Sequence, residues 1–241
     1  MRRNFLRSVE RFDFGNALYF DGINDSLDFF NSDTIASLNK ISISLWCKTN
    51  NFAVSSNTSV ANNRMWFNYN SSSANRITAA FRTASQGNAV YTATAVDGFL
   101  NADINHFVCV YDGTKTLDAD RIKVYLNGNL LTGTPLLVPT SLNSNILQDL
   151  DIGFFFSNNT NGAIDEFALD VNYALNQSEV TALYNSKKGA NYIYKVGRTP
   201  YIYCQMNEND GEVEALNIGT LAVNGNLNNF TTPPAYFKPF V

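Results

Sequence analysis

Apolar and polar residues alternate along most of the chain with a period of two, the pattern of β-strands that bury one face. The clearest case is residues 41–48, ISISLWCK, in which the odd-numbered positions are apolar and share one face. The other face carries Trp46 among Ser and Lys side chains. We therefore expect one side of this strand to be core and the other to present a tryptophan beside polar neighbours.

Other runs rich in β-branched and aromatic residues predict further short strands. They are residues 17–20, 26–30, 64–69, 76–82, 89–95, 106–112, 121–126, 149–156 and 201–206. The three runs between residues 64 and 95 are separated by short turns rich in Ser, Asn and Gly, and they predict a meander. Residues 50–63 are mainly Asn, Ser, Thr and Ala, which predicts a long polar loop.

Two turn sequences predict hairpins. Residues 21–25, DGIND, are rich in residues that tolerate a left-handed conformation, so the runs before and after them are expected to pair. Asn127-Gly128 is the strongest two-residue hairpin signal in the chain.

One short helix is predicted after residue 176. Asn176 fits the N-cap position, and Glu179 stands where a capping box places a carboxylate. The pattern predicts a helix over residues 177–185, followed by cations and Gly189 at its end.

The composition suits a globular β-protein and narrows its partners. Hydrophobic residues make up 45% of the chain and aromatic residues 13%, enough for a buried core. Charged residues make up only 16%, and the formal net charge is −4. Without an overall basic surface for a phosphate backbone, nucleic-acid binding is not expected.

Residues 1–15 form the one basic cluster and predict an N-terminal docking arm. The side chains expected to dock are Arg2, Arg3, Phe5, Leu6 and Arg7. The alternative is an arm that touches nucleic acid or a membrane. This segment lacks the apolar core of a signal peptide, and no run of about 18 apolar residues occurs, so neither classical secretion nor a membrane span is expected.

The three cysteines, Cys47, Cys109 and Cys204, each lie alone inside an apolar strand-like run. Their odd number and the lack of C-x-x-C spacing predict buried free thiols.

Residues 161–175, NGAIDEFALDVNYAL, run from a glycine turn through a strand with an acidic pair into a helix start. HFVCVYDG at residues 106–113 and KVYLNG at residues 123–128 are two further motifs, and Ile152-Gly153 is a third. Together they resemble the closing strand, the central strands and the I-G element of laminin-G-like, concanavalin A-like jelly rolls. The residues from Tyr192 onward resemble the tail of such domains in phage and Bacteroidetes proteins.

The resemblance implies an all-β fold, an antiparallel jelly-roll β-sandwich with one short helix. Residues 16–190 are expected to form the sandwich and residues 1–15 the arm. Residues 191–241 are expected to form an extension packed on or beside the sandwich, because they have too little apolar surface to fold alone.

Hydrolases with this fold carry two carboxylates about 5–5.5 Å apart, spaced along a strand as E-x-D-x-x-E or a close variant. No such spacing is seen here, because Asp165 and Glu166 are neighbours that a regular strand sends to opposite faces. The acids at residues 208–214 are expected in a solvated loop, and His106, the only histidine, in a structural role. No enzyme is therefore expected; a divergent glycoside hydrolase is the remaining catalytic alternative.

A calcium site is a further implication of the resemblance. Domains of this family sometimes hold a structural calcium near the opening F-D-G-x-x-D turn and the I-D-E strand, which here supply Asp21, Asp25 and Asp165. In members without metal, the same Asp ties loop amides together. No cofactor is required by this reading, and calcium and tethering are the two alternatives.

A sugar site needs aromatic platforms beside amides and carboxylates on an exposed face. Candidates on or next to the polar faces of their strands are Trp46, Trp66, Tyr69, Tyr91 and Tyr125. The alternative for each is packing in the core or at a subunit interface.

The leading functional prediction is a non-enzymatic phage virion protein, a capsid-decorating or fibre-like component with its lectin-like domain on the particle exterior. The arm, the Asn/Ser-rich composition and the phage-like tail motivate it, with other virion proteins as partners and a homo-oligomer expected. The alternative is a glycan-binding adhesion module for cell-surface polysaccharide.

Overall fold

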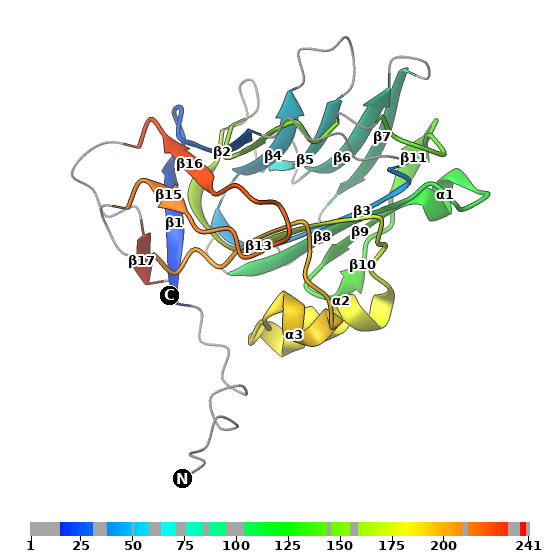
Figure 1. Cartoon of the computed structure of the whole chain (residues 1–241). Helices are drawn as coiled ribbons and strands as arrows, with labels where there is room; N and C mark the ends of the chain where they lie inside the picture. Colours follow the sequence, from blue (N-terminus) through cyan, green and yellow to red (C-terminus); the bar gives the residue numbers. More distant parts are fainter. Residues whose placement is uncertain are drawn as a thin grey trace.

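The strands of the computed structural model form two antiparallel sheets that pack face to face (Figure 1). We call them sheet A and sheet B. The structure describes residues 15–30, 38–49, 51–57, 64–70, 76–83, 87–94, 104–143, 146–154, 159–208, 212–230 and 237–239.

Sheet A contains the long central strands of the sandwich. Its order is β10 (Asn129–Leu130), β9 (Ile122–Leu126), β8 (Asn105–Asp112), β3 (Lys40–Thr49), β13 (Asn161–Val171), β1 (Asn16–Asp21) and β17 (Phe237–Pro239), and β14 (Ile202–Cys204) also pairs with β13. Sheet B has the order β11 (Thr134–Leu136), β7 (Gly87–Thr94), β6 (Arg76–Thr83), β5 (Arg64–Asn70), β4 (Asn51–Asn57), β12 (Asp149–Ile152), β2 (Ser26–Phe30), β16 (Gly225–Asn228) and β15 (Glu214–Ala215).

The core lies between the two sheets, where alternate residues of each strand interdigitate. Phe52 of β4 meets Phe107 of β8 with ring centroids 4.7 Å apart. The three cysteines are buried and free, which confirms the prediction of unpaired thiols.

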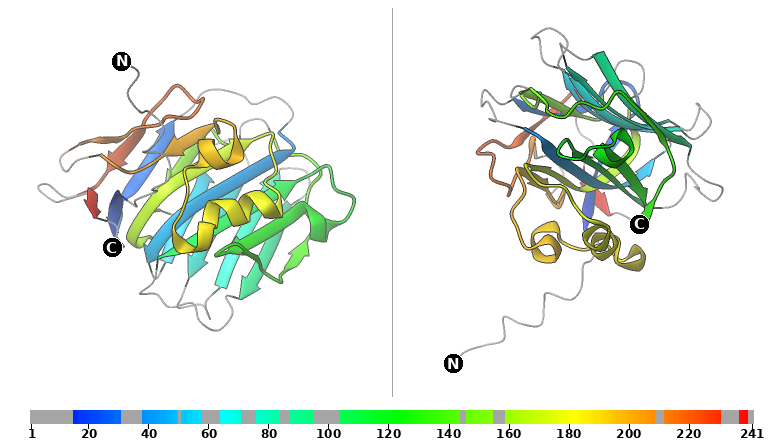
Figure 2. Two further views of the ribbon diagram at one scale, coloured as in Figure 1. Left: turned by 90° about the horizontal axis from the view of Figure 1, so that it is seen from below. Right: turned by 90° about the vertical axis from the view of Figure 1, so that its right-hand side faces the viewer.

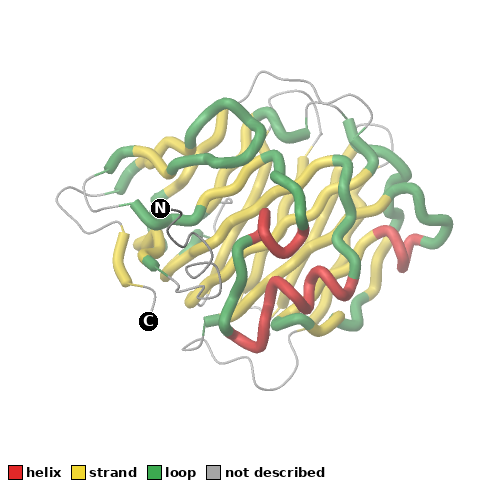
Figure 3. Tube along the Cα trace, turned by 60° about the horizontal axis from the view of Figure 1, so that its bottom comes forward, coloured by secondary structure: helices red, strands yellow, loops and turns green. Residues whose placement is uncertain are grey.

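Two short helices cover the outer face of sheet A (Figures 2 and 3). These are α2 (Gln177–Tyr184) and α3 (Tyr192–Val196); η1 (Asn185–Lys187) follows α2, and α1 (Asp118–Arg121) precedes β9. Val180 and Leu183 of α2 pack with Val108 and Val110 of β8 in a second apolar cluster. Each strand of sheet A near these helices is therefore buried on both faces.

The predicted helix at 177–185 is confirmed as α2, including its capping box. The Asn176 side chain accepts a hydrogen bond from the Glu179 backbone N–H at 3.0 Å, and Glu179 Oε2 accepts one from the Asn176 N–H at 2.8 Å. The shorter α3 was not predicted. Its start is capped by Asn191, and Gly197 ends it with φ of 76°.

Residues 51–57 correct the predicted loop at 50–63, because they form strand β4. Phe52 and Val54 point into the core and alternate with Ala53 and Ser55, which lie on the opposite face. Small polar residues hid this alternation in the sequence. The rest of the predicted loop, residue 50 and residues 58–63, lies outside the described residues.

The expected hairpin around residues 21–25 is also corrected, because β1 and β2 do not pair. β1 pairs with β13 and β17 in sheet A, and β2 pairs with β12 and β16 in sheet B. The turn therefore carries the chain from one sheet to the other. The meander of β5, β6 and β7 and the Asn127-Gly128 hairpin are both confirmed.

The C-terminal residues extend both sheets. β14 and β17 join sheet A, while β15 and β16 continue sheet B beside β2. Gly225 of β16 approaches Leu27 so closely that an added Cβ would lie 2.4 Å from its Cδ1. The tail thus shares the core of the sandwich with residues near the N-terminus.

Candidate functional site

The structure separates the five aromatic residues predicted to contact sugar. Trp46 is 2% exposed, Tyr69 is fully buried between the sheets, and Tyr125 is 3% exposed beneath the helices. Their prediction as exposed platforms is therefore wrong. Tyr91 lies on β7, but its side chain is outside the described part of the structure. Trp66 is half-buried on the outer face of β5.

Trp46 is buried because α2, which ends at Tyr184, covers the face of β3 that carries the Ser and Trp side chains. Its ring stacks on His106 with centroids 4.8 Å apart and on Tyr184 with centroids 5.9 Å apart. His106 Nε2 lies 2.9 Å from Ser44 Oγ, and burial lowers the pKa of His106 to about 3. The imidazole is therefore neutral and packed, in the structural role predicted for it.

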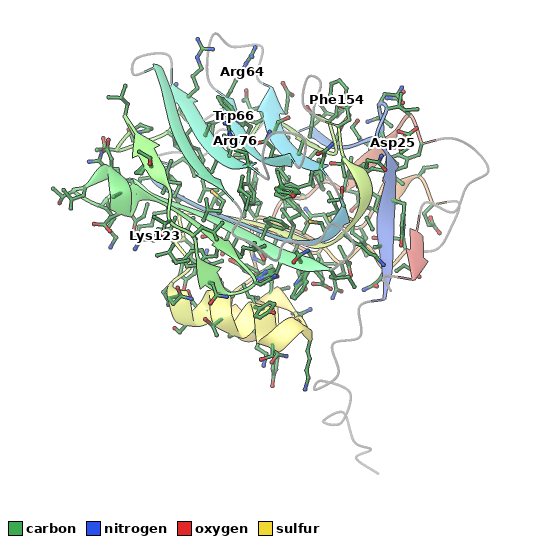
Figure 4. The ribbon with its side chains drawn as sticks, turned by 180° about the vertical axis from the view of Figure 1, so that it is seen from behind. Asp25, Arg64, Trp66, Arg76, Lys123 and Phe154 are labelled. Atoms are coloured by element: carbon green, nitrogen blue, oxygen red, sulfur yellow. The ribbon has the colours of Figure 1, made fainter. Side chains whose placement is uncertain are left out.

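The outer face of sheet B surrounds Trp66. Among the described residues no helix packs on this face, and Figure 4 shows Trp66 on the side of the sandwich away from α2. Ser55 of β4 and Ala80 of β6 are the residues directly opposite Trp66 on its two neighbouring strands. Both are small, and both are buried, with Ser55 2% and Ala80 0% exposed, so neighbouring side chains cover them. Asn68 lies two residues further along the same face.

Arginines lie at both ends of this part of the face. Arg64 and Arg82 are directly opposite each other on β5 and β6, and both are half-buried. Arg76 is exposed at the other end of β6, and Figure 4 shows it on the same side of the sandwich as Arg64. The positively charged positions thus flank the tryptophan along the strand direction.

Carboxylates occupy the neighbouring part of the face. Asp151 of β12 is directly opposite Asp28 of β2 and directly opposite Ser55 of β4. Burial, a hydrogen bond with Asp28 and the charges of Asp28 and Asp149 together raise the pKa of Asp151 to about 8. Asp28 Oδ2 also accepts a hydrogen bond from Asn228 Nδ2. Asp151 is therefore mostly protonated at neutral pH.

Two exposed phenylalanines mark the edge of the same face. Phe30 at the end of β2 is 59% exposed, and Phe154 after β12 is 39% exposed. The Ser55 hydroxyl donates a hydrogen bond to the Phe154 carbonyl oxygen at 3.1 Å, which holds this segment over β4. Large apolar side chains exposed beside polar groups are typical of binding surfaces.

A small pocket lies on another part of the molecule. Its volume is about 170 Å³, and its lining residues are Gln205, Asn207, Glu208, Leu216 and Ile218. Small-molecule sites usually begin near ~300 Å³. The outer face of sheet B is the stronger candidate for a ligand as large as an oligosaccharide.

Of the three predicted calcium ligands, the structure brings Asp21 and Asp25 together but leaves Asp165 apart from them. Asp21 pairs with Asn161 at the start of the β1–β13 ladder, and Asp165 is four residues further along β13, roughly 13 Å away at the usual strand rise. Asp25 instead accepts a hydrogen bond from the Asp21 backbone N–H at 2.7 Å, and Asp21 accepts one from the Ile23 N–H at 2.7 Å. These are the contacts of a loop tether.

Asp165 and Glu166 correct another expectation, because they do not point to opposite faces. A β-bulge interrupts the β13–β3 pairing here, and Glu166 has a left-handed backbone with φ of 49°. Tyr203, on the outer face of sheet A, donates a hydrogen bond to Glu166 Oε2. Asp165 lies opposite Trp46 on that same outer face.

Burial of this acidic pair changes its protonation. Asp165 is 1% exposed and Glu166 is 5% exposed. Burial raises the pKa of Asp165 well above its usual value and that of Glu166 to about 8, and the Glu166 charge adds to the shift at Asp165. Within the described residues, no three His, Cys, Asp or Glu side chains are arranged to hold a metal ion.

Sequence reasoning found Trp66 but missed its charged neighbours. The signal that could have found them is alternation, because it puts Arg64 on the same strand face as Trp66, Arg82 on that of Ala80, and Asp149 on that of Asp151. What the sequence did not show was which strands lie side by side. Of the predicted docking arm, residues 1–14 lie outside the described residues. None of the described helices has the length and hydrophobicity of a membrane span.

Comparison with known proteins agrees with this fold. A laminin G family model of the concanavalin A-like lectin/glucanases superfamily matches residues 21–181. A search among curated proteins gave no significant match.

Solved structures similar to the chain share its fold at low sequence identity. The heptameric SAP-like pentraxin of Limulus polyphemus has a TM-score of 0.52 and 15% identity, and the alignment covers 70% of this chain and 82% of the pentraxin. Domains LG4-5 of the mouse laminin alpha1 chain have a TM-score of 0.50 and 12% identity, covering 68% of this chain and 43% of that one.

A third similar structure is the CBM40 of the Ruminococcus gnavus IT-sialidase, bound to alpha2,3 sialyllactose. Its TM-score is 0.50 with 12% identity, and the alignment covers 71% of this chain and 99% of that one. The matched family model spans strands β2 to β13 and most of α2. This chain therefore belongs to the concanavalin A-like lectin/glucanases superfamily, with a laminin G-type jelly roll.

Proposed function

We propose that this protein is a non-enzymatic glycan-binding module that binds sugar on the outer face of sheet B. The observation that carries the proposal is Trp66, a half-buried indole on a sheet face over which no described helix packs, with the small residues Ser55 and Ala80 directly across from it. Sugar rings stack their C–H faces on such rings and bond their hydroxyls to nearby amides and carboxylates. Asn68 and Asp151 supply those groups.

The similar structures support a binding role by fold likeness alone. The CBM40 structure contains sialyllactose, and a sandwich of the same type is built here. Two sheets make a rigid platform, so side chains on the outer strands are held in place before a ligand arrives. Such preorganisation reduces the entropy lost on binding.

The alternative of a glycoside hydrolase concerns the carboxylates on the same face. A retaining hydrolase needs two carboxyl groups about 5–5.5 Å apart, and an inverting one needs a wider gap. Asp28 and Asp151 face each other directly across one strand pair, and the charge of Asp28 adds to burial in raising the pKa of Asp151 to about 8. We assign this pair to the binding surface, and a screen for sugar release by the purified chain tests that assignment.

Replacing Trp66 tests the proposal directly. On a glycan array probed with the full chain, we expect the wild type to bind and Trp66→Ala to bind at least about tenfold more weakly, because it loses the stacking surface. Tyr194→Ala is the matched control, since Tyr194 is 63% exposed on α3 at the opposite side of the sandwich. Equal binding by wild type and Trp66→Ala would refute the site.

We also infer that the loop at residues 21–25 is held by hydrogen bonds and needs no calcium. The melting temperature should be the same in calcium and in chelator. Asp25→Ala should lower stability by about 1–2 kcal/mol, because it leaves the Asp21 N–H without its acceptor. A melting temperature that rises with calcium in the wild type and not in Asp25→Ala would show a metal site instead.

The virion role is a separate and finer proposal. Its support is the sequence resemblance of the tail and the basic arm, and the arm lies almost wholly outside the described residues. Glycan binding by the exposed sheet is compatible with a component of a particle exterior. Imaging of a purified particle that shows no density for this chain would exclude it.

A further inference from the structure

We propose that the outer face of sheet B selects acidic sugars, and that Arg64 and Arg82 bind the carboxylate or sulfate group of the ligand. This inference rests on the proposed glycan binding at Trp66 and names its substrate class. It comes from the pairing of strands β5 and β6, which brings two cationic side chains to the same end of the platform.

The register makes the two arginines direct neighbours. Arg64 and Arg82 are opposite each other in an antiparallel pair, so their side chains leave the sheet at the same end of the platform. Both side chains are half-buried on the outer face. The planar fork of arginine matches the oxygens of carboxylate and sulfate, so two neighbouring guanidinium groups suit one anionic group of a ligand.

Arg82 differs from arginines elsewhere in the molecule. Arg121 bonds Asp118 at 2.7 Å and Arg198 bonds Asp170 at 2.8 Å, so both have carboxylate partners. Across the described residues, Arg82 forms no ion pair. Its charge on the face of sheet B is therefore available to a ligand.

The spacing fits one acidic sugar on the platform. Arg64 is two residues from Trp66 on the same strand face, roughly 7 Å at the usual strand rise. Arg82 is the same distance from Ala80, which lies directly opposite Trp66. A ring stacked on the indole would place an acidic substituent within reach of both arginines.

The acidic side chains near the arginines favour a ligand with a single anionic group. The chain has a net charge of −4, and Asp28, Asp149 and Asp151 lie on the neighbouring strands of the same face. A long polyanion crossing the whole sheet would meet these carboxylates. The arrangement therefore favours a sugar with one acidic group over the β5–β6 end and hydroxyl groups toward β12.

The test uses glycans in matched pairs, each acidic sugar beside its carboxyl-reduced or desulfated counterpart, with binding measured by titration of the full chain. We expect wild type to prefer the acidic member by about tenfold or more, and salt to reduce this preference. In the double variant Arg64→Gln/Arg82→Gln, the preference should fall to about twofold or less while binding of the neutral member is retained. The carboxylated and sulfated pairs show which acidic group is favoured.

Lys123→Gln is the matched control, because it removes one positive charge from β9 of sheet A, away from Trp66 (Figure 4). It should keep the wild-type preference. If the double variant also keeps that preference, the arginine assignment is wrong, although loss of binding in Trp66→Ala would still support the glycan site. If the wild type binds neutral and acidic members equally, the selectivity is refuted; if it binds no glycan, the proposed function fails too.

Discussion

Trp46→Ala is expected to lower the free energy of unfolding by about 3–5 kcal/mol, the usual range for removing a fully buried tryptophan. The indole is 2% exposed and packs against both His106 and Tyr184. The substitution leaves a cavity under α2 and removes the ring on which His106 stacks. Urea unfolding at pH 7, followed by circular dichroism, measures the loss.

Trp66→Ala is the informative comparison, because the same chemical change is made on the other sheet. Trp66 is only half-buried, so we expect a loss of about 1 kcal/mol or less. Trp46 should thus contribute mainly to stability and Trp66 mainly to binding. A loss of less than about 1 kcal/mol for Trp46→Ala would contradict the packing described for α2.

This contrast shows where sequence reasoning succeeded and where it could not. Alternation identified the core-facing residues of β3 correctly, because period-two patterning records which face is apolar. It could not show that the Ser and Trp face of β3 is also covered. That face is buried by α2, which is more than 120 residues away in the sequence, and no local pattern in β3 records such a partner.

The candidate site was predictable only in part for a similar reason. Trp66 and its same-strand neighbour Arg64 follow from the alternation of one strand. The juxtaposition of Arg64 with Arg82, and of Asp28 with Asp151, depends on strand order and register in sheet B. The β12–β2 pair joins segments more than 100 residues apart, so its acidic pair could not be recognised from spacing.

The acidic pair in β13 shows a further reason why the geometry could not be predicted from the sequence. Period-two reasoning assumes a regular strand, and the bulge at Asp165 and Glu166 breaks that assumption. The motif was recognised correctly as the closing strand of a laminin-G-like jelly roll, as the family match confirms. Its geometry, with both carboxyl groups on the helix-covered face of sheet A, needed the structure.

Glu166→Gln is expected to make the protein more stable at alkaline pH and to flatten its pH dependence. The pKa of Glu166 is raised from 4.5 to about 8, mainly by burial, so the folded protein keeps this carboxyl protonated where the unfolded chain ionises it. The stabilising contribution is complete below pH 4.5 and is lost as the pH rises through about 8. Over that window, one such group changes stability by up to ~1.4 kcal/mol per pH unit.

The measurement is urea unfolding at several pH values between 6.5 and 8.5. His106 titrates in the opposite sense, because its folded pKa of about 3 is below its usual 6.5, so its destabilising effect is confined to lower pH. In Glu166→Gln the amide oxygen can still accept the Tyr203 hydrogen bond, so the fold should be kept.

Asp151→Asn is the matched comparison for this experiment, because the pKa of Asp151 is also raised to about 8 but on the outer face of sheet B. Each substitution should restore part of the stability that the wild type loses as the pH rises. The two effects should add, because the residues lie in different sheets. If Glu166→Gln loses stability with pH as steeply as wild type, Glu166 is ionised in the fold. The hydrogen bonds that Tyr203 and Gln205 donate to Glu166 would then outweigh the effect of burial on its carboxyl group.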